Sequence, residues 1–200
     1  MPKTANLNVD VLIDFISGTL PVPGGEEVID YINHETEERN NLDAINVFIA
    51  DCHDPDNKDH FSIWPKHALR GTLGQMFHPR LKIPDGSFIV LKGTGKRNNG
   101  YSAFDKEDVE IYIKLGRWRL PLSFKTLHDL LVSLEIIRTN VRGLATNFCD
   151  KATALDSANL GYMTSIHLNA CRGIPFPDDD PRSVKKALEE MEMAGVELVY

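Results

Sequence analysis

The sequence has 200 residues, of which 42% are hydrophobic and 26% are charged, a composition typical of a globular domain with a full core. Its net charge of −7 disfavours a nucleic-acid-binding protein, because no strong basic field covers the chain. No apolar run approaches the ~20 residues of a membrane span, so we expect no membrane association. No apolar signal core follows the N-terminus, and three cysteines are an odd number for a disulfide framework, so we expect a cytoplasmic protein.

Segments typical of strands and of helices alternate along the chain. Strands are expected at residues 7–13, 44–50, 87–91, 136–144, 163–168 and 196–199. Helices are expected at residues 26–40, 124–134, 152–160 and 183–194. This alternation predicts a three-layer α/β/α domain with a mainly parallel six-stranded sheet. Ligands of such a sheet bind at the carboxyl ends of its strands.

Residues 107–122 do not fit this alternation. Within them, residues 109–115 alternate polar and apolar side chains with a period of two, and Gly116 and Arg117 follow. The pattern indicates either a β-hairpin or a distorted helix. We interpret the segment as a surface elaboration of a single domain spanning residues 1–200. The alternative interpretation is a part in substrate gating or in contacts within a homo-oligomer.

Three of the seven histidines lie in one short segment, residues 51–67, directly after the strand expected at 44–50. With the carboxylate that ends the strand they make four possible metal ligands: Asp51, His53, His60 and His67. Side chains of an extended segment alternate, so Asp51 and His53 point to the same side and Cys52 points away. Imidazoles with a carboxylate suit a divalent metal and leave positions open for water or substrate. The alternative is a solvated polar loop with no metal.

Three further reactive side chains lie at strand ends. Asp10 stands among apolar residues of the first expected strand, where a carboxylate costs free energy unless it is paired or functional. Lys92 ends the third expected strand, and Cys149 follows the fourth and opens the next helix, whose N-terminus would lower the pKa of the thiol. Singly, each residue has a structural explanation. Together they indicate an acid-base carboxylate, a cation and a nucleophile at one edge of the sheet.

Short motifs are spread along nearly the whole chain: V-D-V-L-I-D-F at residues 9–15, V-P-G-G at 22–25, D-C-H at 51–53, D-H-F-S at 59–62, W-P-K-H at 64–67, K-G at 92–93, Y-S-A-F at 101–104 and G-L-A-T-N-F-C at 143–149. Together they resemble the motifs of the nicotinamidase/pyrazinamidase family of isochorismatase-like cysteine hydrolases. Residues 51–67 are similar to the family's metal loop, which most other members of the superfamily lack. The thiol of Cys149 argues against the isochorismatase branch, whose members lack that nucleophile.

The resemblance implies a role for each matching residue. The implied catalytic triad is Asp10, Lys92 and Cys149. The implied ligands of one divalent metal ion, zinc with iron or manganese as alternatives, are Asp51, His53, His67 and, as in some relatives only, His60. The implied lining of a pocket for an aromatic ring is Phe15, Trp64 and Tyr101. A cis peptide bond between Leu144 and Ala145 would turn the amide N–H of Ala145, with that of Cys149, toward an oxyanion.

The implied reaction is hydrolysis of nicotinamide, and also of pyrazinamide, to the acid and ammonia through a thioester on Cys149. The expected partner is therefore this small-molecule substrate. The sequence departs from the family's pattern at Leu12 and Ile13 and at residues 96–99 and 107–122, which bears on the substrate range. Three alternatives stay open: an amidase of the same fold for another small carboxamide, a metal- or ligand-binding protein without turnover, and a zinc hydrolase that uses metal-bound hydroxide.

Overall fold

The computed structural model describes residues 3–38, 44–97 and 99–200, and its centre is one eight-stranded sheet of order β5-β4-β3-β2-β1-β6-β7-β8. The strands are β1 Thr4–Val9, β2 Ala44–Asp51, β3 Phe88–Lys92, β4 Glu110–Leu115, β5 Trp118–Pro121, β6 Arg138–Leu144, β7 Met163–Arg172 and β8 Glu197–Val199. The neighbouring strands β3, β2, β1, β6, β7 and β8 are parallel to one another. Strand β4 is antiparallel to β3 and to β5. The predicted mainly parallel sheet is confirmed.

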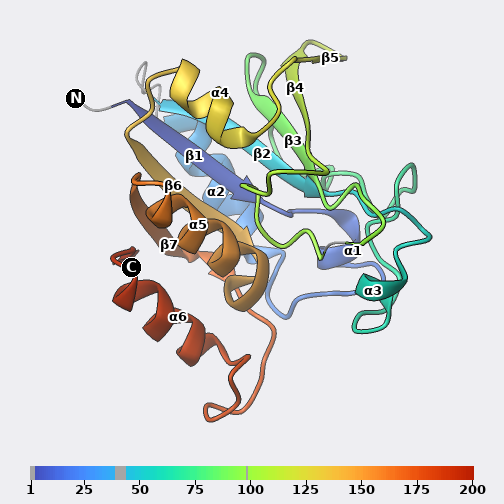
Figure 1. Ribbon diagram of the computed structural model, residues 1–200, viewed down its shortest axis with the longest axis vertical. Coiled ribbons are helices and arrows are strands. Elements are labelled where there is room, and N and C mark those ends of the chain that lie inside the picture. Colours follow the sequence, from blue (N-terminus) through green and yellow to red (C-terminus); the bar gives the residue numbers. More distant parts are fainter. Residues whose placement is uncertain (1–2, 39–43, 98) are drawn as a thin grey trace.

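Helices cover both faces of the sheet. The helices are α1 Ile13–Ile16, α2 Glu27–Glu38, α3 Lys58–Phe61, α4 Leu127–Ser133, α5 Lys151–Asn159 and α6 Val184–Met193. Figure 1 shows α4, α5 and α6 in front of the sheet and α2 behind it, which confirms the three-layer α/β/α class. Residues 39 and 40 of the helix predicted at 26–40 lie outside the described residues. None of the described helices has the length and apolar character needed to cross a membrane.

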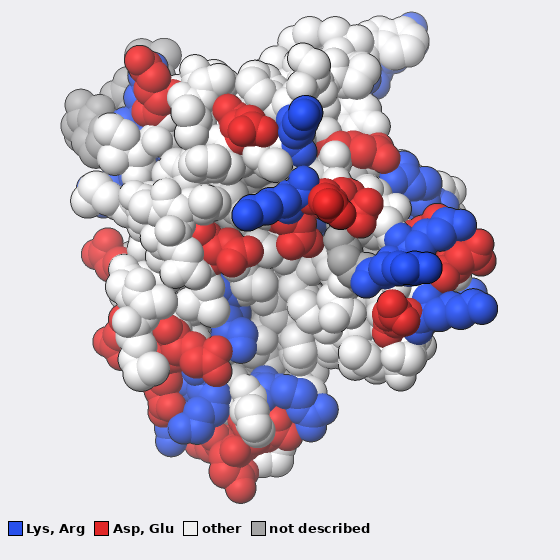
Figure 2. Space-filling model, in the orientation of Figure 1, with Lys and Arg blue, Asp and Glu red and all other residues white. Residues whose placement is uncertain are grey.

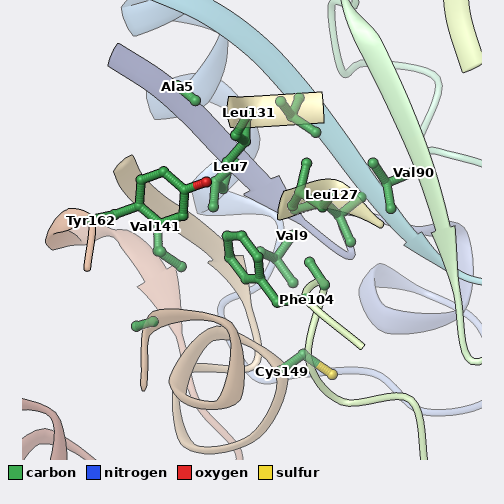
Figure 3. Packing of buried hydrophobic residues seen from close by; sticks show 14 of the residues in the cluster. Ala5, Leu7, Val9, Val90, Phe104, Leu127, Leu131, Val141, Cys149 and Tyr162 are labelled. Carbon is green, nitrogen blue, oxygen red and sulfur yellow. The ribbon is translucent and has the colours of Figure 1, made fainter. Parts of the chain in front are cut away.

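The alternation of side chains along the strands divides the core in two. In β1, Ala5, Leu7 and Val9 are fully buried on the face that packs against α4, α5 and α6. The second core lies between the other face and the apolar side of α2. Figure 3 shows Cys149 at one end of the first core, below Val9 and Phe104. Figure 2 shows that acidic and basic side chains are interspersed on the surface seen in the orientation of Figure 1.

The β-hairpin indicated for residues 107–122 is confirmed. Residues 110–121 form the hairpin of β4 and β5, which adds two antiparallel strands to the sheet, so the sheet has eight strands and not the six expected. Ile111 is buried in the first core, while all four residues of β5 are exposed. The period of two therefore reflects a strand with one packed face, as is usual in antiparallel pairs.

Gly143 near the end of β6 allows β6 to lie directly against the end of β1. Its φ of 135° is one that L side chains rarely adopt, and a Cβ there would lie 2.0 Å from the carbonyl oxygen of Val9. We expect Gly143→Ala to lower the free energy of unfolding by about 3 kcal/mol or more, because backbone atoms must move apart. Gly116→Ala is the matched control: its φ is also positive, at 57°, but its Cβ would meet nothing within 4 Å. Equal midpoints of urea unfolding for the two variants would refute this.

Candidate active site

The carboxyl ends of four neighbouring strands bring the predicted reactive side chains together. Lys92 ends β3 and Asp51 ends β2, and the two residues are paired in the strand register. Asp10 follows β1, and Cys149 follows β6. The strands lie in the order β3-β2-β1-β6, and the arrowheads of the first three point toward α1 and α3 (Figure 1). Parallel strands thus place all four residues at one edge of the sheet, as predicted.

The strand predicted at residues 7–13 instead spans Thr4–Val9, so Asp10 lies after it rather than inside it. The strand ends at Val9 because Asp10 takes a left-handed backbone conformation with φ 52°. The amide N–H of Asp10 donates to the carbonyl of Ile49 at 2.9 Å, and the amide N–H of Asp51 donates to Asp10 Oδ1 at 2.8 Å. These bonds fix the Asp10 carboxylate at the end of β2.

Lys92 is the centre of a fully buried ionic group. Its Nζ lies 2.9 Å from Asp10 Oδ2, donates to Asp51 Oδ1 and to the carbonyl of Gly100 at 2.9 Å, and lies 3.4 Å from Cys149 Sγ. Burial would lower the pKa of Lys92, but Asp10 and Asp51 outweigh it and raise that pKa well above its usual value. Lys92 is therefore a permanent ammonium between two carboxylates and the thiol.

The two carboxylates beside Lys92 differ in proton affinity. Burial and the negative charge of Asp51 raise the pKa of Asp10 to about 6, although Lys92 opposes the shift. Burial acts on Asp51 in the same direction, but Lys92 and His53 hold the pKa of Asp51 far below its usual range. Asp51 thus stays ionised, whereas Asp10 is suited to take up and release a proton near neutral pH.

The environment of Cys149 differs from the prediction. Helix α5 begins at Lys151, and Cys149 lies before it in a short π-helical turn, Thr146–Asp150. Burial raises the pKa of the Cys149 thiol well above its usual value, and Lys92 opposes this only in part. The expected lowering by a helix N-terminus is therefore wrong, and Cys149 holds a neutral thiol that hydrogen-bonds to the Asp10 carboxylate.

Beside this group, three buried imidazoles converge. Donor atoms of His53, His60 and His67 lie within 4.8 Å of one another, and Asp51 Oδ2 lies 3.4 Å from His53 Nε2. His53 Nδ1 faces the carbonyl of Gly93 at 3.3 Å, which leaves Nε2 directed at the other ligands. His53 Nε2 is buried and has no hydrogen-bond partner among the described residues. A buried, unpartnered imidazole nitrogen beside a carboxylate fits a divalent metal ion.

His60 and His67 complete the set of nitrogen donors. His67 Nδ1 lies 2.7 Å from the carbonyl of Pro65, and its Nε2 lies 3.4 Å from His60 Nε2. Burial and the proximity of His53 lower the pKa of His60 to about 3, so this imidazole is neutral and offers a lone pair. The structure thus brings all four predicted metal ligands together, including His60.

Removal of one imidazole should weaken metal binding in a graded way. We expect His53→Ala to reduce the zinc affinity of the reconstituted protein by more than about 100-fold, and His60→Ala by about tenfold, the size typical of an accessory ligand. His128→Ala on α4 is the control. His128 does not belong to this group of imidazoles, and its Nδ1 lies 2.9 Å from the hydroxyl oxygen of Tyr162. Metal analysis after dialysis against zinc measures the difference. Full zinc occupancy of the His53→Ala variant would show that His53 is not a metal ligand.

A pocket lies between the imidazoles of His60 and His67 and the thiol of Cys149. Its polar lining includes Asp51, His60, His67 and Cys149, and its other lining residues are Phe15, Leu20, Val22, Trp64, Tyr101, Ala145, Phe148 and Ile174. Trp64 Nε1 donates to the Tyr101 hydroxyl at 2.7 Å, and the Trp64 ring meets Phe148 edge-on at 4.9 Å. Such a pocket suits a flat aromatic ring with one polar edge.

The turn that carries Cys149 is closed by its own main chain. The amide N–H groups of Phe148 and Asp150 donate to the carbonyl of Ala145 at 2.9 and 3.2 Å. The peptide bond between Leu144 and Ala145 is cis, as the resemblance implied. Ala145 and Cys149 both border the pocket, where the resemblance places the oxyanion hole.

Sequence reasoning missed several residues that shape the site. Asp14 is one: its Oδ2 accepts the amide N–H of Ala68 at 2.8 Å, and its Oδ1 accepts that of Thr19 at 3.1 Å. It thereby joins α1, which carries Phe15, to the segment of His67. Its place in the V-D-V-L-I-D-F motif was a signal for it. Val22, in the V-P-G-G motif, had the same kind of signal. The pocket residues Leu20 and Ile174 had none, because an isolated apolar residue in a loop is uninformative in sequence.

The isochorismatase domain profile matches residues 4–199. The chain belongs to the isochorismatase domain family. Its fold and the positions of its strand-end residues agree with the resemblance found in the sequence.

Relatives within the isochorismatase domain family match along almost the whole chain. The nicotinamidase of Escherichia coli (strain K12) is 29% identical over 218 residues, which cover 99% of this chain and 95% of that protein. The pyrazinamidase of Pyrococcus horikoshii in complex with zinc has a TM-score of 0.80 and 28% identity, with 99% of both chains covered. PnC1 of L. infantum in complex with nicotinate has a TM-score of 0.77 and 26% identity, covering 99% and 92%.

Proposed function

We propose that this protein is a metal-assisted cysteine amidohydrolase that converts nicotinamide to nicotinate and ammonia and also accepts pyrazinamide. The observation that carries the proposal is a pocket lined by Cys149, which lies against Lys92 and Asp10, on one side and by the imidazoles of His60 and His67 on the other. The nicotinamidase and pyrazinamidase relatives support this choice of substrate.

The pocket walls hold the aromatic ring of the substrate. Phe15, Trp64 and Tyr101 supply its aromatic sides, and Phe15 also meets the ring of His67 edge-on at 5.2 Å. The metal ion, zinc with iron or manganese as alternatives, would be held by Asp51, His53, His60 and His67. When bound, it supplies a Lewis acid that accepts the lone pair of a ring nitrogen.

In the first half of the reaction, Asp10 takes the proton of the Cys149 thiol. The thiolate sulfur attacks the carboxamide carbon, a C–S bond forms, and the amide N–H groups of Ala145 and Cys149 hold the oxyanion. One such donor is typically worth ~3 kcal/mol of the barrier. The C–N bond then breaks, and Asp10 gives its proton to the leaving group, which departs as ammonia.

In the second half, a water molecule gives a proton to Asp10 and attacks the thioester carbon. The C–S bond breaks, the product leaves as nicotinic acid and loses its carboxyl proton to solvent to give nicotinate, and the proton on Asp10 returns to the sulfur of Cys149. Lys92 stays protonated throughout. Its ammonium, 3.4 Å from Cys149 Sγ, stabilises the thiolate that neither burial nor Asp51 favours.

Incubation of the zinc-loaded protein with nicotinamide, with assay of ammonia and nicotinate, tests the proposal. We expect equal amounts of both products, and a kcat/KM for benzamide at least about 100-fold lower, because its ring has no nitrogen to bind the metal. Equal rates for benzamide and nicotinamide would favour an amidase for other small carboxamides. Binding of nicotinamide without ammonia release would favour a ligand-binding protein.

A further inference from the structure

Asn147 is a buried polar residue, 2% exposed, that the reaction above does not use. Its amide group binds the segment 173–182, which joins β7 to α6. Asn147 Nδ2 donates to the carbonyl oxygens of Ile174 at 2.9 Å and of Arg182 at 2.6 Å, while Oδ1 accepts the amide N–H of Ile174 at 3.0 Å. One side chain therefore holds both the start and the end of this segment.

The segment 173–182 forms one wall of the ring pocket. Ile174 lines the pocket directly. Behind it, the Phe176 ring lies 6.1 Å from that of Phe148, and the Arg182 guanidinium lies over Phe176 at 4.2 Å. The segment's own main-chain bonds are short turns, such as the one from Asp180 N–H to the carbonyl of Pro177 at 2.9 Å. Such turns fix the local shape of the segment but do not attach it to the turn that carries Cys149.

The close fit of Asn147 to the segment is visible at Gly173. A Cβ on Gly173 would lie 2.9 Å from Asn147 Oδ1 and 2.3 Å from Val184. A larger residue at position 173 would therefore require the side chains of Val184 and Asn147 to move. The Cys149 turn, in contrast, is closed by bonds to the carbonyl of Ala145 and does not depend on the Asn147 amide.

We propose that Asn147 is a positioning residue that fixes the Ile174 wall of the pocket and so determines how tightly the substrate ring is held. It acts through Ile174 and does not touch the reacting atoms. Its effect on substrate affinity rests on the proposed function, whereas its effect on the segment 173–182 does not.

The test variant is Asn147→Asp, which keeps the shape but replaces the donor to two carbonyl groups with a second acceptor. We expect the KM for nicotinamide to rise about tenfold and kcat to stay within about twofold, because loss of apolar pocket contact weakens binding by roughly this factor. Asn140→Asp on β6 is the matched control. Asn140 is also buried and hydrogen-bonded to Asn6 and Ser165, but it does not line the pocket. Its KM should equal that of the wild type.

Hydrogen exchange gives a second readout that needs no activity. Amides of residues 173–183 should exchange faster in Asn147→Asp than in the wild type and in Asn140→Asp. Asn147→Ser, which also loses the two donors, provides the same comparison if Asn147→Asp does not fold. The proposal requires both changes, so unaltered exchange, an unaltered KM, or a fall in kcat alone overturns it. If the wild type releases no ammonia from nicotinamide, the proposed function fails, and the exchange data alone decide the role of Asn147.

Discussion

Cys149→Ala should abolish ammonia release from nicotinamide, with a loss of about 10⁴-fold or more, because removal of a catalytic nucleophile leaves only binding and the oxyanion hole. Cys149 is the thiol that lies 3.4 Å from Lys92 and borders the pocket. The variant removes no proposed metal ligand, so its zinc content should equal that of the wild type. Continuous ammonia assay and metal analysis of the same preparation measure both quantities.

Cys171→Ala is the matched control for that variant. Cys171 is also a free, buried cysteine in the first core, but it does not line the pocket. We expect it to lose some stability through the smaller side chain and to keep its turnover within a few-fold. Substantial turnover in Cys149→Ala would instead favour hydrolysis by metal-bound hydroxide, which needs no thiol.

Lys92→Met should lower kcat/KM for nicotinamide by about 10³-fold or more while the protein still folds. The substitution keeps the aliphatic stem but removes the charge that stabilises the thiolate and pairs with Asp10 and Asp51. Breaking a buried ion pair usually costs ~3–5 kcal/mol of stability, and protonation of Asp10 would relieve part of this. Lys151→Met is the control. Lys151 is the first residue of α5, its ammonium pairs with the carboxylate of Glu190, and it does not line the pocket.

The loss of charge at Lys92 should also be visible without substrate. Lys92 lowers the pKa of the Cys149 thiol against the effect of burial, so its removal raises that pKa further. Less thiolate is then present at neutral pH, and alkylation of Cys149 by iodoacetamide should slow. The measurement is the pH dependence of alkylation in the wild type and in Lys92→Met. Superimposable profiles, with unchanged turnover, would exclude Lys92 from the site.

The parallel sheet and its reactive edge could be predicted because the signals are local in the sequence. Apolar runs such as residues 45–50 mark buried strands, and Asp51 and Lys92 mark where two of them end. Parallel strands bring these ends to one edge, so residues far apart in sequence meet there. The candidate metal ligands in residues 51–67 could be predicted equally well, because three histidines in so short a segment are unusual.

Other features depend on contacts that no local pattern encodes. Asp51 joins the two halves of the site, since one oxygen binds Lys92 and the other faces His53. The pKa of the Cys149 thiol was predicted in the wrong direction because desolvation, which follows from packing, outweighs the position of the thiol before α5. The Ile174 wall depends on the long-range bonds of Asn147.

Trapping with hydroxylamine tests the central claim, a thioester on Cys149, most directly. An acyl-enzyme partitions between water and hydroxylamine, so the wild type should form nicotinohydroxamate at the expense of nicotinate, in proportion to the hydroxylamine added. Cys149→Ala should form neither product. Chromatography that finds nicotinate as the sole acyl product at every hydroxylamine concentration, with undiminished turnover of nicotinamide, would contradict the thioester and point to direct attack by water.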